Sequence, residues 1–184
     1  MKTDMNRTPY TFLLLALLVV SLGSCQEKAI YATFNTEYEF EAKIPPTTGI
    51  SLPFELFTTE QESNFESQYS INDTRKDLVS EVELTGFTIQ IVDPQGKSFS
   101  FLQSVAFYID SNDDPEAKIA EKDPVPDTTG NELILDVFSS NLAPYIKSDD
   151  FIIRMNAVTD ETISNEITVR GVVNFRIRAR VIGG

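Results

Sequence analysis

The sequence has 184 residues, with 28 acidic and 15 basic side chains, no histidine, no tryptophan and one cysteine. The absence of histidine excludes Ser-His-Asp and Cys-His catalysis and histidine-ligated zinc or haem. A single cysteine excludes an internal disulfide, a Cys-x-x-Cys redox pair and an iron–sulfur cluster. The length suits one domain with a sizeable core, and 41% hydrophobic residues is too apolar for a disordered chain.

The amino terminus has the organisation of an export signal. A basic stretch with Lys2 and Arg7 precedes the apolar run Phe12–Val20, which is too short to span a bilayer. Small residues follow and end at the lone cysteine. We therefore expect a signal segment that is removed. The alternatives are an ordinary secretory signal in which the cysteine is incidental and an uncleaved anchor.

The tetrapeptide Leu22-Gly23-Ser24-Cys25 resembles the lipobox of bacterial lipoproteins. The resemblance implies a signal peptide of residues 1–24, cleavage between Ser24 and Cys25, and lipidation of Cys25 by a diacylglyceryl group and an acyl chain. In this family an aspartate after the cysteine commonly retains the protein at the inner membrane. Gln26 stands there instead, which favours the outer membrane and leaves open whether the protein faces the periplasm or the outside.

The charge of the mature chain limits its partners. After cleavage it carries 27 acidic and 13 basic residues, a net charge of −14. Such a charge disfavours nucleic acid and flat binding to an anionic leaflet. We expect contact with the membrane through the lipid anchor, a protein or glycan partner in the envelope, and no cofactor beyond the covalent lipid.

The first and last segments of the mature chain are its clearest predicted strands, because apolar and polar residues alternate over residues 30–44 and 167–181. The polar side of the first segment carries Glu37, Glu39 and Glu41. The polar side of the last carries Arg176, Arg178 and Arg180. Opposite charges on neighbouring strands attract, so we expect these two strands to be adjacent, with the six residues forming a structural charge ladder. Binding of an anion by the arginines is the alternative.

Further strands are predicted between them. Apolar alternation marks residues 50–56, 82–91, 105–109, 133–137 and 151–157, with a short candidate at 118–120. Pro53 indicates a sheet edge, and the change of phase at Gly86 indicates a bulge. The segment Asp93–Gly96 has the residues of a type I turn.

These patterns predict an all-β fold, a single antiparallel β-sandwich of immunoglobulin-like type with seven or eight strands. The sandwich occupies residues 30–184 after a lipidated tether of residues 25–29. Only residues 74–80 and 141–147 are expected to form helical turns. Residues 60–75 and 111–131 are polar and predicted to be loops.

One group of polar residues offers hard oxygen ligands for calcium at a predicted strand end. It comprises Asp110, Asn112, Asp113 and Asp114. The spacing differs from that of an EF-hand, and acidic residues also simply solvate turns, so this is a minor hypothesis.

No catalytic motif stands out, and we expect a non-catalytic binding or accessory module. A glycan-binding accessory and a subunit of a surface assembly are the alternatives, followed by a hydrolase using two carboxylates, for which no pair is distinguished. Aromatic platforms for sugars would come from Tyr31, Tyr69, Tyr108 and Tyr145. The loops expected to meet a partner are residues 45–49 and 93–97, at the end away from the anchor.

Overall fold

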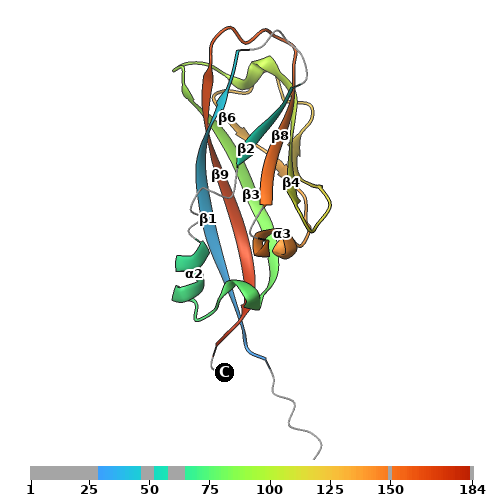
Figure 1. Ribbon diagram of the computed structural model, residues 1–184. Helices are drawn as coiled ribbons and strands as arrows, with labels where there is room; N and C mark the ends of the chain where they lie inside the picture. Colours follow the sequence, from blue (N-terminus) through green and yellow to red (C-terminus); the bar gives the residue numbers. More distant parts are fainter. Residues whose placement is uncertain (1–28, 47–51, 58–64, 149–150, 183–184) are drawn as a thin grey trace, which may run out of the picture.

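The computed structural model describes residues 29–46, 52–57, 65–148 and 151–182. Within these residues nine strands form two antiparallel sheets that pack as an elongated sandwich, and the longest helix has seven residues (Figure 1). The predicted all-β antiparallel sandwich is confirmed.

Each sheet combines strands that are distant in the sequence. The four-stranded sheet has the order β1 (Tyr31–Ile44), β9 (Ile167–Arg180), β3 (Val79–Asp93) and β6 (Glu132–Ile134). The five-stranded sheet has the order β2 (Leu52–Phe57), β8 (Phe151–Thr159), β4 (Leu102–Ser111), β5 (Ala117–Lys122) and β7 (Asp136–Val137). The short helices are α2 (Phe65–Ile71), η1 (Lys76–Leu78), η2 (Phe99–Phe101) and α3 (Ala143–Lys147).

The strand order differs from the immunoglobulin order that we expected. Without the two-residue β7, the sheets read 1-9-3-6 and 2-8-4-5, the order of a jelly roll, in which the chain crosses repeatedly between the sheets. In an immunoglobulin sandwich the first two strands pair in one sheet. The alternation of apolar and polar residues predicts where strands lie and which of their faces are buried. It does not predict which strands pair, because the paired strands are far apart in the sequence.

The predicted inward faces of the outermost segments are confirmed. Along β9 every odd-numbered residue from Ile167 to Ala179 is buried, and along β1 the odd-numbered residues are exposed. The core between the sheets centres on Phe87, whose ring centroid lies 4.4 Å from that of Phe107. Burial of such aromatic side chains dominates the stability of a sandwich without disulfides.

Local predictions on β2 and β3 are confirmed, and the turn after β3 needs correction. Strand β2, which contains Pro53, is an edge strand, and the β3 register shifts between Leu84 and Gly86. The turn lies one residue later than predicted, since the Lys97 N–H donates to the Pro94 carbonyl. Gly96 is third in that turn with φ of 78°, as a type II turn requires and a type I turn does not.

Two segment predictions were incomplete. The apolar residues 133–137 form two strands in different sheets, β6 on β3 and β7 on β5, and this division makes nine strands rather than seven or eight. The predicted loop 60–75 contains α2, which has a nearly fully buried Tyr69. Among residues 67–71 of this helix Tyr69 alone is buried, and a single buried side chain produces no helical period in the sequence. Strand β5 confirms the short candidate at 118–120.

The two ends of the described domain lie together at one pole. Strand β1 pairs with β9 along its whole length, with Tyr31 opposite Arg180 and Ile44 opposite Ile167, so the predicted adjacency is confirmed. The Val181 N–H donates to the Ile30 carbonyl at 2.9 Å. Figure 1 shows the carboxyl end beside the start of β1. We call this end the entry pole and the opposite end the far pole.

The predicted signal peptide, Cys25 and Gln26 lie outside the described residues. Among the described residues, no helix has the length and apolar character needed to cross a bilayer.

Candidate binding groove on the five-stranded sheet

Two adjoining hollows lie on the outer face of the five-stranded sheet, which we call together the groove. They have volumes of about 440 and 180 Å³ and share Tyr108 of β4 and Asn156 of β8. The larger hollow is also lined by Glu116, Arg154 and Met155. The smaller is also lined by Ser104, Val105, Ala106, Lys118, Glu121, Asp123 and Val158. The groove combines one central aromatic ring and a few aliphatic side chains with several polar and charged groups, and such a mixture can orient a ligand that has both apolar and polar parts.

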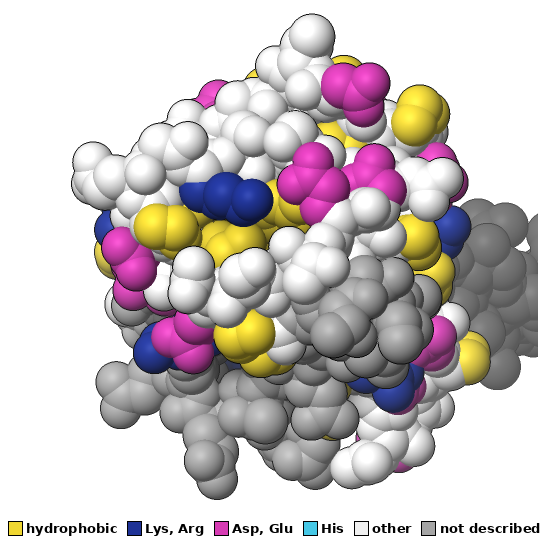
Figure 2. Space-filling view, turned by 90° about the horizontal axis from the view of Figure 1, so that it is seen from above, with side chains coloured by type: hydrophobic (Ala, Val, Ile, Leu, Met, Phe, Trp, Pro, Cys, Tyr) yellow, Lys and Arg dark blue, Asp and Glu magenta, His cyan; other side chains and the backbone are white. Residues whose placement is uncertain are grey.

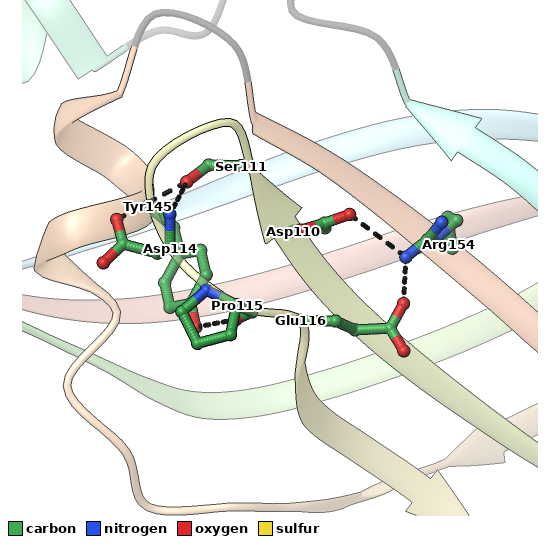
Figure 3. Close-up of polar contacts among 7 residues, drawn as sticks. All are labelled: Asp110, Ser111, Asp114, Pro115, Glu116, Tyr145 and Arg154. Carbon is green, nitrogen blue, oxygen red and sulfur yellow. Dashed lines mark hydrogen bonds and ion pairs between the residues drawn. The ribbon is translucent and has the colours of Figure 1, made fainter.

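Arg154 is held in place by carboxylates from two elements (Figure 3). Its Nη2 donates to Asp110 Oδ2 at 3.2 Å and to Glu116 Oε2. Asp110 is the second-last residue of β4 and Glu116 directly precedes β5, so the arginine of β8 links three segments. These contacts fix the guanidinium at the groove while its Nε and Nη1 make no hydrogen bond with the described residues.

The residues proposed for calcium have other partners. Asp110 pairs with Arg154, while the Ser111 hydroxyl donates to Asp114 Oδ2 at 3.4 Å and accepts from the Asp114 N–H at 3.1 Å. Across the described ranges, no three Asp, Glu or Cys side chains are placed to hold a metal ion. Asp110 therefore contributes to the Arg154 contact and Asp114 to the turn between β4 and β5, in which Asn112 and Asp113 also lie.

The same turn is fastened to α3 by Tyr145. Its buried hydroxyl donates to the Pro115 carbonyl at 2.6 Å (Figure 3). Burial raises the pKa of Tyr145 above its ordinary value of 10, and the nearby Asp114 and Asp110 carboxylates raise it further. All three effects favour the neutral hydroxyl, so the donated hydrogen bond persists at physiological pH.

Tyr145→Phe is expected to lower the free energy of unfolding by about 1 kcal/mol at pH 7, the typical cost of losing one hydrogen bond. Because the folded-state pKa is raised, the Tyr145 contribution is complete below about pH 10 and falls as the pH rises through the folded value. The variant should therefore lose less stability than wild type between pH 9 and 11. The loss that remains is due to Tyr38, whose pKa burial raises, and to Lys43 and Lys118, whose pKa values are raised by hydrogen bonds to Glu166 and Glu121. Urea unfolding at several pH values between 9 and 11 measures this pH dependence of the free energy of unfolding. An unchanged slope in Tyr145→Phe would contradict the assignment.

The four candidate tyrosines have different surroundings. Tyr69 and Tyr145 are buried, and the Arg178 guanidinium lies 4.6 Å from the ring centroid of Tyr31 at the entry pole. Tyr108 lines both hollows of the groove, and its hydroxyl makes no hydrogen bond with the described residues. Tyr108 is therefore the aromatic platform, among the four, that a ligand could use.

Charges in the groove largely neutralise one another. Lys118 Nζ lies 2.7 Å from Glu121 Oε2, and this hydrogen bond raises the pKa of Lys118. The ammonium also lies 5.9 Å from the Tyr108 ring centroid. With Arg154 bound to Glu116, Asp123 is the one charged lining residue without an ion pair among the described residues. The groove therefore presents hydrogen-bonding groups rather than a strong field of one sign.

The charge ladder has different partners from those expected. Arg176 Nη1 lies 3.0 Å from Glu83, and Arg178 Nη1 lies 3.9 Å from Glu81, both on β3. Between β1 and β9 the ion pair is Glu41 with Arg170, at 3.2 Å. The cause is register, because Glu37 and Glu39 face Asn174 and Val172. Strand β9 lies between two acidic strands, and alternation alone did not predict β3 as the second neighbour.

The described parts of the two loops expected to meet a partner, residues 45–46 and 93–97, lie at the far pole. Ile44 faces Ile167 and Asp93 faces Thr168 at that end of the sheet. Residues 47–49 of the first loop lie outside the described residues. Figure 2 shows the far pole, where the coloured part of the surface mixes hydrophobic, basic and acidic side chains in small groups. This pole offers a less defined site than the groove.

Sequence reasoning missed most groove residues, among them Arg154, Glu116 and Asn156. Arg154 and Asn156 occupy alternate positions of β8 and lie on its outer face, which the alternation predicts to be polar without indicating a site. A basic residue in an otherwise uncharged strand was the one available signal.

Comparisons with known proteins do not assign a family. No protein-family model and no curated protein sequence matches the chain. Similar solved chains come from tomato aspermy virus (9% identity, covering 95% of this chain and 97% of that chain, TM-score 0.32) and mud crab tombus-like virus (7%, 86% and 86%, 0.35). A third comes from Desmodium yellow mottle tymovirus (8%, 88% and 97%, 0.31). At such identities and TM-scores, the similarity carries no argument about function.

Proposed function

We propose that this protein is a lipid-anchored binding module of a bacterial cell envelope, without catalytic activity, attached through Cys25 and using the groove as its contact surface. The outer membrane is the proposed location, on the basis of Gln26. The observation that carries the binding role is the groove, in which Tyr108 is surrounded by paired charges on a rigid sheet. The lipobox carries the anchor.

The geometry of the entry pole agrees with such an anchor. Four residues separate Cys25 from Ile30, and the five steps along the chain between the two span at most about 18 Å. Strand β1 then runs 14 residues, roughly 46 Å, to the far pole. A bilayer holding Cys25 would lie directly below the sandwich and leave the groove exposed on its flank between the two poles.

The groove is suited to binding rather than to catalysis. Its carboxylates Glu116 and Glu121 are each held in an ion pair, with Arg154 and Lys118 respectively. Strands β4 and β8 form the floor, so the lining side chains start from fixed backbone positions. A preformed surface of this kind spends little conformational entropy on binding.

Photocrosslinking in intact cells tests the proposal. A photoreactive phenylalanine analogue at position 104, which lines the groove, is expected to trap a defined partner. The same analogue at position 39, exposed on the opposite sheet, is the matched control and should trap none. Equal patterns from the two positions, or no adduct from position 104, would contradict the groove as the contact surface.

A glycan-binding accessory is the second candidate, and Tyr108 favours it. Aromatic rings provide an apolar surface for the C–H face of a sugar, and the mixed donors and acceptors around Tyr108 suit hydroxyl groups, which both donate and accept. The composition of the adduct at position 104 distinguishes a sugar from a protein. If the partner is a glycan, Tyr108→Ala should abolish the adduct, whereas Tyr31→Ala should retain it.

A further inference from the structure

Exposed large hydrophobic side chains gather at the entry pole. Ile71 is 73% exposed, Ile30 56%, Ile182 50% and Tyr31 45%. The described residues contain six such exposed side chains, so this pole holds four of them. Folding leaves single apolar side chains on many surfaces, but a group at one end indicates an interaction site.

Backbone hydrogen bonds bring these side chains together from three parts of the chain. The Val181 N–H donates to the Ile30 carbonyl, and the Ile182 N–H donates to the Asp73 carbonyl at 2.8 Å. Ile71 ends α2 two residues before Asp73. The start of β1, the end of α2 and the residues after β9 therefore meet where the predicted tether leaves the domain, as the arrangement at the lower end of Figure 1 shows.

Charges at this pole are balanced although the mature chain carries −14. Arg75 Nε lies 2.6 Å from Asp77 Oδ1, and Arg178 lies over Tyr31. Arg180 is also exposed there, and its carbonyl accepts a hydrogen bond from the hydroxyl of Thr74, which follows the acidic Asp73. The pole thus avoids the electrostatic repulsion that the rest of the acidic surface would meet at a membrane. Tyrosine and arginine are also side chains that suit the headgroup region, where apolar and polar groups are both accommodated.

We propose that the entry pole docks on the phospholipid surface, with Ile30, Tyr31, Ile71 and Ile182 in the headgroup region, so that the domain stands upright on its anchor. The inference rests on the proposed lipidation of Cys25, because one cluster of this size does not bind a membrane stably by itself. A tether of at most about 18 Å keeps the pole at the surface, and contact there removes apolar area from water. The docked pole fixes the direction in which the groove faces.

The lack of tryptophan in the chain allows a direct test. The full-length lipidated protein carrying Ile182→Trp is reconstituted into phosphatidylcholine vesicles with or without lipids brominated near the headgroup. The indole emission is expected to shift to shorter wavelength and to be quenched at least twofold by the brominated lipids. Ile134→Trp, at a position 65% exposed on β6, is the matched control and should emit as in water without quenching. Adding Ile71→Glu to Ile182→Trp should reduce the quenching.

The outcomes separate docking from anchoring. Protein that floats with the vesicles but shows equal, unquenched emission from positions 182 and 134 overturns docking and leaves the anchor intact. Protein that fails to float overturns the proposed anchor, and docking with it. Both tryptophan positions are exposed, so neither change disturbs the core.

Discussion

Gly171→Ala is expected to lower the free energy of unfolding by about 3 kcal/mol and the melting temperature by roughly 6 to 12 °C. Gly171 of β9 lies opposite Phe40 of β1, and a Cβ at position 171 would stand 1.9 Å from two atoms of the Phe40 ring. The ring cannot move aside freely, because it is buried and makes an edge contact with Phe87 at a centroid distance of 6.1 Å. In a strand without this clash, replacing glycine by alanine would raise the free energy of unfolding by about 0.5 to 1 kcal/mol. A measured decrease therefore identifies the contact between position 171 and the Phe40 ring.

Gly86→Ala is the matched control, since a Cβ there meets its nearest atom at 3.6 Å, an ordinary contact. Its melting temperature should lie within about 2 °C of wild type. Phe40→Leu in the Gly171→Ala background should recover part of the loss, because it removes the ring atoms in conflict. Equal melting temperatures for Gly171→Ala and Gly86→Ala would show that the ring does not lie over Gly171.

Cys25→Ser is expected to abolish lipid attachment completely. Serine lacks the thiol that would receive the diacylglyceryl group, and the chain has no second cysteine. Each buried methylene contributes about 0.8 kcal/mol to membrane binding, so losing two or three acyl chains removes stable anchoring. Cells fed an alkyne-tagged fatty acid should label the wild-type protein strongly and the variant not at all.

Ser24→Ala serves as the control, because it keeps a small residue before the cysteine and should keep the label. A label that persists in Cys25→Ser would place the lipid elsewhere. A wild-type protein without label would refute the lipobox.

How far the sequence predicts this fold depends on the range of the interactions involved. The alternation in residues 30–44 and 167–181 predicted both strands and their buried faces, because a half-buried strand imposes a period of two locally. Pro53 and Gly86 predicted the edge and the bulge for similarly local reasons. The type II turn depends on the positive φ of Gly96. The residue pattern, with proline second and glycine fourth, predicted a type I turn and did not specify this conformation.

Long-range pairing was less predictable. The charges of β1 and β9 predicted their adjacency, but β3 supplies Glu81 and Glu83 to the same arginine row, and this neighbour follows only from the strand order. The division of residues 133–137 between the sheets likewise depends on where β3 and β5 lie.

The groove was predictable only in part. Tyr108 was one of four candidate tyrosines, and burial and contacts separate it from Tyr69, Tyr145 and Tyr31. Arg154 and Glu116 meet because β8 pairs with β4 and the following turn leads into β5, and no short motif encodes such a meeting. The sequence indicated Asp110 only as one carboxylate of a possible calcium cluster. Its partner in the structure is Arg154, 44 residues further along the chain.

Attachment through Cys25 is the central claim, because the orientation of both the groove and the entry pole depends on it. Mass spectrometry of the amino-terminal tryptic peptide from membrane-extracted protein tests it directly. Trypsin cuts after Lys28, so the account predicts a peptide of residues 25–28 carrying a thioether-linked diacylglyceryl group and an amide-linked acyl chain. A peptide that reads through from Thr8 to Lys28 with an unmodified cysteine would contradict it.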